Sequence, residues 1–140
     1  MPQTTNATRP ITVVTHDGGL RLIADVRGHV VATDQPYTAG GTDSAAMPLE
    51  LIGAALGTCI ALAVVQFCNT RDIPTDGLSV SVEQHTAKTP YRVDRYQVGL
   101  ILPHALPTEY REAIDRVART CAAYNTLRGT PDILISVSPD

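Results

Sequence analysis

The stretch PLELIGAALGTCIALAVVQFC, from Pro48 to Cys68, decides the fold of this 140-residue chain. It reads as one helix, because Pro48 suits the first helical position and Pro74 stops the helix near Asn69–Asp72. Almost every residue in it is apolar, so the helix has no side for solvent and must be buried. Cys59 lies near its middle, where a thiol is either inert packing or a reaction centre.

A helix of this length could also cross a bilayer, because about 1.5 Å of rise per residue gives it a span of roughly 31 Å. Gly53 and Gly57 would then form a helix-pairing GxxxG motif. Against a membrane span, Glu50 and Gln66 lie inside the run and no Lys/Arg cluster flanks it. We therefore expect burial in protein and no membrane partner, with the small residues allowing a sheet or another helix to approach closely.

The bulk composition indicates a globular protein, with 44% hydrophobic and 18% charged residues. The length predicts a single domain over residues 11–140, preceded by a disordered or extended polar tail over residues 1–10. The net charge is −3 and the 11 Lys and Arg residues are scattered, which argues against nucleic acid as a partner. The N-terminus lacks the apolar core of a signal peptide, so we expect a protein of the cytoplasm. Because that compartment is reducing, the three cysteines are expected to be free thiols.

The sequence on either side of the long helix predicts an α+β fold with a mostly antiparallel sheet. Six strands are expected, at Ile11–His16, Leu20–Val26, His29–Thr33, Leu78–Glu83, Arg92–Leu102 and Asp132–Val137. Residues 34–47 read as a long loop, and a second helix opens at Pro107 with Thr108 as N-cap and runs to Cys121 on its buried face. The strands come as hairpins rather than alternating with helices. A chain of this size has few other elements with which to cover one wholly apolar helix. We therefore expect a second copy of the chain to help cover it, in a homodimer.

Two thiols are the candidate reactive groups. Cys59 and Cys121 each lie on the expected core face of a helix. A redox pair also needs the thiols within bonding reach and a nearby charge that lowers a pKa of about 8.5. The residues alone leave open whether the thiols meet, and packing as small hydrophobes is the alternative. Cys68 is expected to be packing. The four histidines show no ligand spacing and there is no CxxC, so no metal site is expected.

Three strings along the chain together resemble the OsmC/Ohr family of osmotically inducible and organic-hydroperoxide-resistance proteins. MPLELIGAALGTC, Met47 to Cys59, is similar to the family's central-helix motif, in which the peroxide-attacking Cys comes eleven residues after the Pro. Arg27 to Asp43 resembles the strand and loop before that helix. CAAYNTL, Cys121 to Leu127, is similar to the second-cysteine motif. The resemblance covers roughly Ile11 to Val137 and points to the broader OsmC-like branch of the family.

The resemblance implies an intertwined homodimer with two long central helices, sheets outside and active sites at the dimer interface. It also implies reduction of organic hydroperoxides to alcohols in protection against oxidative stress. Cys59 would become a sulfenic acid, Cys121 would form a disulfide with it, and a dithiol reductant would restore both thiols without metal or organic cofactor. The alternative is a non-enzymatic OsmC-like protein that binds a small apolar or thiol-reactive ligand at the dimer interface.

Two departures from the family pattern concern the charges that would activate Cys59. The carboxylate of the best peroxidases follows the Pro directly, but here Leu49 takes that place and Glu50 comes one residue later. Glu50 and Cys59 would lie on opposite helix faces about 13 Å apart, and a contact with the helix N-terminus is the alternative role of Glu50. The loop before the helix contains no arginine. Arg21 and Arg27 remain as candidates, each alternatively a solvated strand or turn charge.

Overall fold

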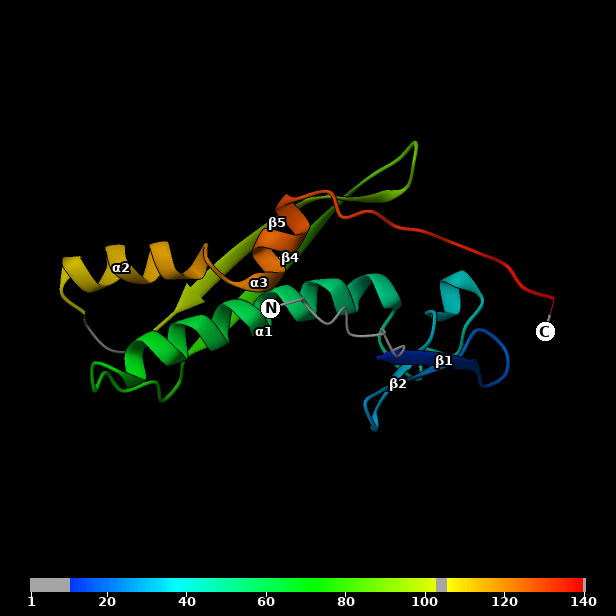
Figure 1. Ribbon diagram of the computed structural model, residues 1–140, viewed down its shortest axis with the longest axis horizontal. Helices are drawn as coiled ribbons and strands as arrows, with labels where there is room; N and C mark the ends of the chain where they lie inside the picture. The colour runs from blue at the N-terminus through cyan, green and yellow to red at the C-terminus, as the bar shows by residue number, and fades with distance from the viewer. Residues whose placement is uncertain (1–10, 103–105, 140) are drawn as a thin grey trace, which may run out of the picture. The chain divides into compact units, whose positions relative to one another are not determined.

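The computed structural model describes residues 11–102 and 106–139, and the chain divides into two compact units, Met1–Ile52 and Gly53–Asp140. Its elements in chain order are β1 (Thr12–His16), β2 (Leu22–Val26), β3 (His29–Thr33), the short 3-10 helix η1 (Tyr37–Ala39), α1 (Pro48–Asn69), β4 (Ser79–Ala87), β5 (Arg92–Ile101), α2 (Thr108–Ala118) and α3 (Ala122–Arg128) (Figure 1). The predicted α+β class with antiparallel strands is confirmed. That both units form one domain stays a prediction, and the expected tail over residues 1–10 lies outside the described residues.

Three antiparallel strands form the sheet of the first unit, in the order β1-β2-β3. A two-residue turn joins β2 to β3 and consists of Arg27 and Gly28, whose φ angles are 56° and 92°. Positive φ at both positions is the geometry of the hairpin turn that matches the natural twist of strands. The side chain of Arg27 is therefore carried at the exposed tip of a hairpin.

A buried carboxylate organises the loop between β3 and α1. Asp34 is 2% exposed. Its oxygens accept hydrogen bonds from the backbone N–H groups of Gln35, Thr42 and Ser44, and from the hydroxyls of Thr42 and Ser44 at 2.7 Å each. These donors, with the Ser44 and Thr42 hydroxyls first, hold the pKa of Asp34 well below its usual range. The predicted long loop is thus an ordered segment.

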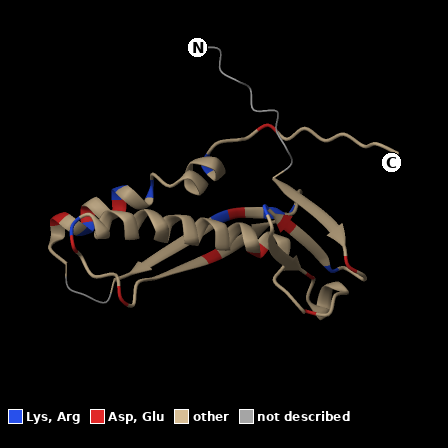
Figure 2. Ribbon diagram, turned by 60° about the horizontal axis from the view of Figure 1, so that its bottom comes forward, with Lys and Arg blue, Asp and Glu red and all other residues tan. Residues whose placement is uncertain are grey.

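Helix α1 confirms the predicted apolar helix. It runs from Pro48 to Asn69, and Glu50 is the only charged residue in it (Figure 2). Gly57, the second glycine of the GxxxG pair, lies close to β4. A Cβ at this position would come within 2.9 Å of Val82 Cγ2. At Gly53 a Cβ would meet the side-chain amide of Gln84. The small residues therefore do what the sequence suggested and let a sheet approach the helix.

The second unit packs α1, the β4–β5 hairpin and the later helices around two apolar clusters. One cluster has Leu56, Ile60 and Cys121 at its centre, and the other has Val64, Cys68 and Ile114. Cys68 has no exposed surface, and burial raises the pKa of its thiol. Its predicted packing role therefore agrees with its position in the core.

Two predictions for the end of the chain are wrong. The second helix has Pro107 rather than Thr108 as its N-cap and stops at Ala118, so it does not reach Cys121. Instead Cys121 is the N-cap of α3, a helix that the sequence analysis did not predict. Its sulfur accepts the Tyr124 N–H, as Ser and Asp oxygens do at helix starts, and this starts a new helix.

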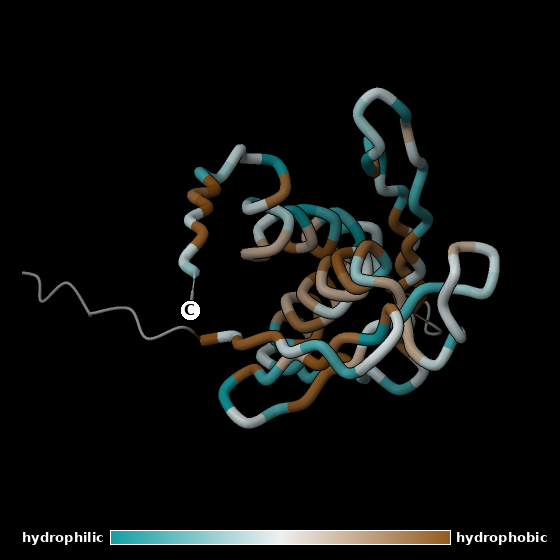
Figure 3. The backbone as a smooth tube through the Cα atoms, turned by 90° about the vertical axis from the view of Figure 1, so that its right-hand side faces the viewer, coloured by the Kyte–Doolittle hydropathy of each residue, from teal (hydrophilic) through white to brown (hydrophobic). Residues whose placement is uncertain are grey.

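The expected strand at residues 132–137 is also wrong for the single chain. The segment forms no ladder with any described strand, and its backbone runs apart from them as a largely hydrophobic stretch near the C-terminus (Figure 3). The side chains of Ile133, Leu134, Ile135 and Val137 are 78–94% exposed. A strand needs a neighbour for its backbone hydrogen bonds, and the described part of the chain offers this segment none.

Candidate functional site

The structure brings Cys59 and Cys121 together. Cys59 comes from the middle of α1 and packs against the cluster that holds Cys121. Cys121 sits at the start of α3, the helix whose first turn also reaches the Cys59 sulfur through the Ala123 N–H. Both are free thiols, Cys121 buried and Cys59 half-buried. Two residues far apart in sequence therefore form one dithiol site within the second unit.

Backbone N–H groups of the first turn of α3 point at both sulfurs. Ala123 N–H donates to Cys59 Sγ at 3.4 Å, and Tyr124 N–H donates to Cys121 Sγ at 3.3 Å. The N–H groups at a helix start have no partner within the helix and carry partial positive charge. The Ala123 N–H therefore stabilises a thiolate on Cys59 without needing a charged side chain.

The two thiols differ in acidity. The Ala123 N–H holds the pKa of Cys59 below its ordinary value, with further help from the Cys121 thiol and the Ala122 N–H, and together these outweigh burial. Burial is the main cause that raises the pKa of Cys121, and the neighbouring Cys59 raises it further. Near neutral pH, Cys59 is therefore the readier thiolate and nucleophile, and Cys121 stays protonated.

The other predicted site residues belong to the first unit. Arg21 donates to the Asp17 carboxylate at 2.9 Å and to the Ser44 hydroxyl at 2.7 Å, so it ties the β1–β2 turn to the loop that Asp34 organises. Arg27 occupies the β2–β3 turn. Glu50 accepts the Met47 N–H at 2.9 Å, which is a capping contact at the start of α1. Glu50 and Arg27 thus lie where their alternative roles, a contact at the helix start and an exposed turn charge, would place them, whereas Arg21 is half-buried and ion-paired. A role of any of the three toward Cys59 stays a prediction.

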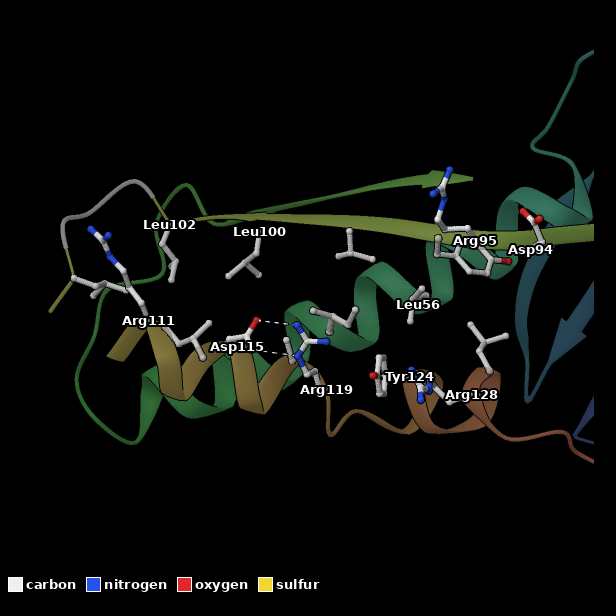
Figure 4. Close-up of a pocket in the computed structure, with 17 residues that line it drawn as sticks. Leu56, Asp94, Arg95, Leu100, Leu102, Arg111, Asp115, Arg119, Tyr124 and Arg128 are labelled. Carbon is white, nitrogen blue, oxygen red and sulfur yellow. Dashed lines mark hydrogen bonds and ion pairs between the residues drawn. The ribbon is translucent and has the colours of Figure 1, made fainter. Parts of the chain in front are cut away.

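A cavity of about 880 Å³ lies beside the dithiol, between β5 and the helices α2 and α3 (Figure 4). Leu56, Ile60 and Tyr124 line it and also belong to the apolar cluster around Cys121. Its volume is in the range of small-molecule pockets. The cavity and the thiol cluster therefore share these three residues, although neither Cys59 nor Cys121 lines the cavity itself.

Charged residues of the cavity were missed by the sequence analysis. They are Arg95, Arg111, Arg119 and Arg128, with Asp94 and Asp115. Only their position in the sequence could have indicated a place near the thiols. Arg119 lies two residues before Cys121, and Arg128 directly follows the second-cysteine motif. Across residues 11–102 and 106–139, no three His, Cys, Asp or Glu side chains gather in a way that could hold a metal ion.

Residues 41–136 match the family model described as OsmC-like protein. The chain belongs to this family. No curated protein matches it in sequence. Helix α1 is long and apolar enough to cross a membrane by length and composition alone. It lies within the OsmC-like match, however, and the matched fold supports a soluble protein.

Solved structures of OsmC-like proteins share the fold. A Psychrobacter arcticus 273-4 protein named for osmotic stress and detoxification has a TM-score of 0.79 at 21% identity, covering 85% of this chain and 88% of its own. The OsmC like protein of Mycoplasma pneumoniae has a TM-score of 0.70 at 20% identity, covering 89% and 90%. An organic hydroperoxide resistance protein from Elizabethkingia anophelis has 0.62 at 20%, covering 89% and 92%. At such identities the comparison shows the fold, and activity must be argued from the site.

Proposed function

We propose that this OsmC-like protein reduces organic hydroperoxides to alcohols, with Cys59 as nucleophile and Cys121 as resolving thiol. The placement of Cys59 against the cluster that holds Cys121 carries the proposal, because it offers Cys59 a partner for a disulfide beside the Ala123 N–H that its sulfur accepts. The name of the Elizabethkingia anophelis protein, an organic hydroperoxide resistance protein, agrees with this activity.

The reaction follows from the order of acidity. The Cys59 thiolate attacks the distal oxygen of the hydroperoxide, the O–O bond breaks, and the departing alkoxide takes a proton to become the alcohol. Cys59 is then a sulfenic acid. The Cys121 sulfur attacks it, the S–O bond breaks and water leaves, forming the Cys59–Cys121 disulfide. A dithiol reductant restores both thiols and is itself oxidised to a disulfide. No metal or organic cofactor takes part.

We also propose that the protein acts as a homodimer. Helix α1 is apolar on nearly every face, yet Ala55 and Leu62 lie on one exposed stripe, and Leu62 is 56% exposed. A helix of this kind needs cover on every side. The largely apolar segment at residues 132–137 equally has no neighbouring strand among the described residues. A second copy of the chain supplies cover for both, in keeping with an intertwined arrangement.

The cytoplasm is the compartment that suits this chemistry. A catalytic dithiol must be reduced again after each turnover, and reducing compartments supply dithiol reductants. Within the described residues all three cysteines are free thiols, as such a compartment would keep them. We therefore propose a cytoplasmic protein that acts in oxidative-stress defence.

Titration of the reduced protein with cumene hydroperoxide tests the activity. We expect one equivalent consumed per chain, loss of two thiols and a mapped Cys59–Cys121 disulfide. Cys59→Ser should consume none, and Cys121→Ser should leave a sulfenic acid that dimedone traps. Cys68→Ala is the matched control and should behave as wild type. Consumption no faster than by free cysteine would refute the enzyme and leave the alternative, a non-enzymatic binding protein.

A further inference from the structure

The start of α3 is held by two sulfur atoms. Cys121 is the N-cap of this helix, and its sulfur accepts the Tyr124 N–H at 3.3 Å. The neighbouring donor of the same turn, the Ala123 N–H, donates to the Cys59 sulfur of α1 at 3.4 Å. The N–H groups of a first turn have no partner within their own helix. Both donors therefore depend on the two thiols of the proposed redox pair.

Helix α3 has few other sources of stability. It consists of seven residues, Ala122–Arg128, and none of them is buried. Helices shorter than about 12 residues are marginal in water without caps or packing. The packing of α3 against the apolar cluster around Cys121 comes from Ala123 and Tyr124, the same two residues whose N–H groups donate to sulfur. Caps and packing thus act on one turn, and weaker caps should release that turn.

A disulfide would change both acceptors at this turn. A hydrogen bond to a charged acceptor is about twice as strong as one to a neutral acceptor. When the Cys59 sulfur joins the Cys121 sulfur, its negative charge is lost and each sulfur turns toward the other. Neutral sulfur is a weak acceptor. The oxidised pair should therefore hold the Ala123 and Tyr124 N–H groups less firmly than the reduced pair does.

The disulfide would also be hard to reach while α3 stays in place. Cys59 is half-buried and Cys121 is 5% exposed. Reduction requires a thiolate of the reductant to contact one of the two disulfide sulfurs directly. Some part of the chain that covers the pair must therefore move before the thiols can be restored. The first turn of α3 covers Cys121, and it is the part whose attachment oxidation weakens.

We propose that the Cys59–Cys121 disulfide releases the first turn of α3, and that this opening admits the dithiol reductant. The inference rests on the proposed function for the formation of the disulfide. In the reduced protein the turn is closed, and its Ala123 N–H stabilises the Cys59 thiolate. The two sulfurs thus form a redox-sensitive cap. The turn is closed while Cys59 acts as the nucleophile, and it opens once the disulfide has to be reduced.

Hydrogen exchange of single amides, followed by NMR on the full chain, tests this release. Reduced protein is compared with protein oxidised by diamide, a diazene that takes two electrons and two protons from the thiols and becomes a hydrazine. We expect the amides of Ala123 and Tyr124 to exchange about five- to tenfold faster after oxidation, the effect expected for loss of a helix cap. Ile114 in α2, a helix whose N-cap is Pro107, is the internal control and should keep its rate.

Two substitutions of Cys121 separate the cap from the disulfide, because neither variant can form the disulfide. Serine is a good N-cap, so Cys121→Ser should keep the reduced wild-type rate at Tyr124 and should not respond to diamide. Alanine has no acceptor, so in Cys121→Ala the Tyr124 amide should exchange about five- to tenfold faster without any oxidant. Cys68→Ala retains both sulfurs of the pair and should respond to diamide as wild type does.

Reduction by dithiothreitol tests whether the opening admits the reductant. Its rate on the oxidised protein should rise in proportion to the dithiothreitol concentration, because the disulfide is already open. A rate that levels off would mean that the chain must first open around a closed disulfide, and would overturn the inference.

Unchanged exchange at Ala123 and Tyr124 after oxidation would also overturn it, as would the absence of a Cys59–Cys121 disulfide after diamide treatment. Equal rates at Tyr124 in Cys121→Ser and Cys121→Ala, or an equal acceleration at Ile114, would show that the cap is not responsible. Because diamide needs no hydroperoxide, these results are independent of the cumene hydroperoxide titration. Release of α3 by diamide in a protein that consumes no hydroperoxide would support the redox-sensitive cap and refute the peroxidase.

Discussion

The close approach of α1 to β4 makes Gly57 a sensitive position, and Gly57→Ala tests it. A Cβ there would lie 2.9 Å from Val82 Cγ2, whereas ordinary contacts begin at 3.4 Å, so helix and strand must separate by about half an ångström. Overpacking of this kind costs about 1–3 kcal/mol. Replacing glycine by alanine inside a helix stabilises the helix by about 1 kcal/mol. We expect Gly57→Ala to lower the free energy of unfolding by about 1 kcal/mol.

Gly53→Ala is the matched control, because there the Cβ meets only the flexible end of the Gln84 side chain, which can turn aside. The gain from replacing glycine inside a helix should then outweigh the small steric cost. The free energy of unfolding should therefore stay equal or rise by up to about 1 kcal/mol. Urea denaturation followed by circular dichroism measures both variants, at one protomer concentration because a dimer's stability depends on it. If Gly57→Ala is as stable as Gly53→Ala, the reasoning about the α1–β4 contact is refuted.

Further predictions concern the thiols, the loop and the end of the chain. Iodoacetamide should alkylate Cys59 at lower pH than Cys121, as peptide mass spectrometry across a pH series would measure; the reverse order would contradict the assignment of the nucleophile. The pKa of Asp34 is lower in the folded protein, so its stabilising effect is full above about pH 4 and is lost as the pH falls further. Asp34→Asn should therefore be less stable than wild type at pH 7, with a gap in thermal midpoint that narrows in acid; a gap independent of pH would refute this origin. Deleting residues 131–140 should weaken the dimer in sedimentation experiments at micromolar concentration, and an unchanged association constant would exclude this segment from the interface.

The sequence was most informative where one local signal decided an element. Pro48 and the apolar run placed α1 with its observed start, and the strand expected after the Arg27-Gly28 turn, β3, has both of its predicted ends. These elements are specified by caps, turns and periodicity, which are properties of adjacent residues. The expected strand at residues 132–137 failed because a strand also depends on a neighbour, which the residues of the segment cannot supply.

The dithiol shows a second limit of sequence reasoning. The apolar helical pattern around Cys121 favoured one continuous helix, but the Cys121 sulfur accepts the Tyr124 N–H and a new helix starts there. That break turns the Ala123 N–H toward Cys59. A sequence pattern cannot reveal this donor, because every residue except proline has a backbone N–H. Only the direction of that N–H in the folded chain decides whether it donates to Cys59. The acidity of Cys59 thus depends on where α3 begins, and the cap that starts α3 is the other thiol of the pair.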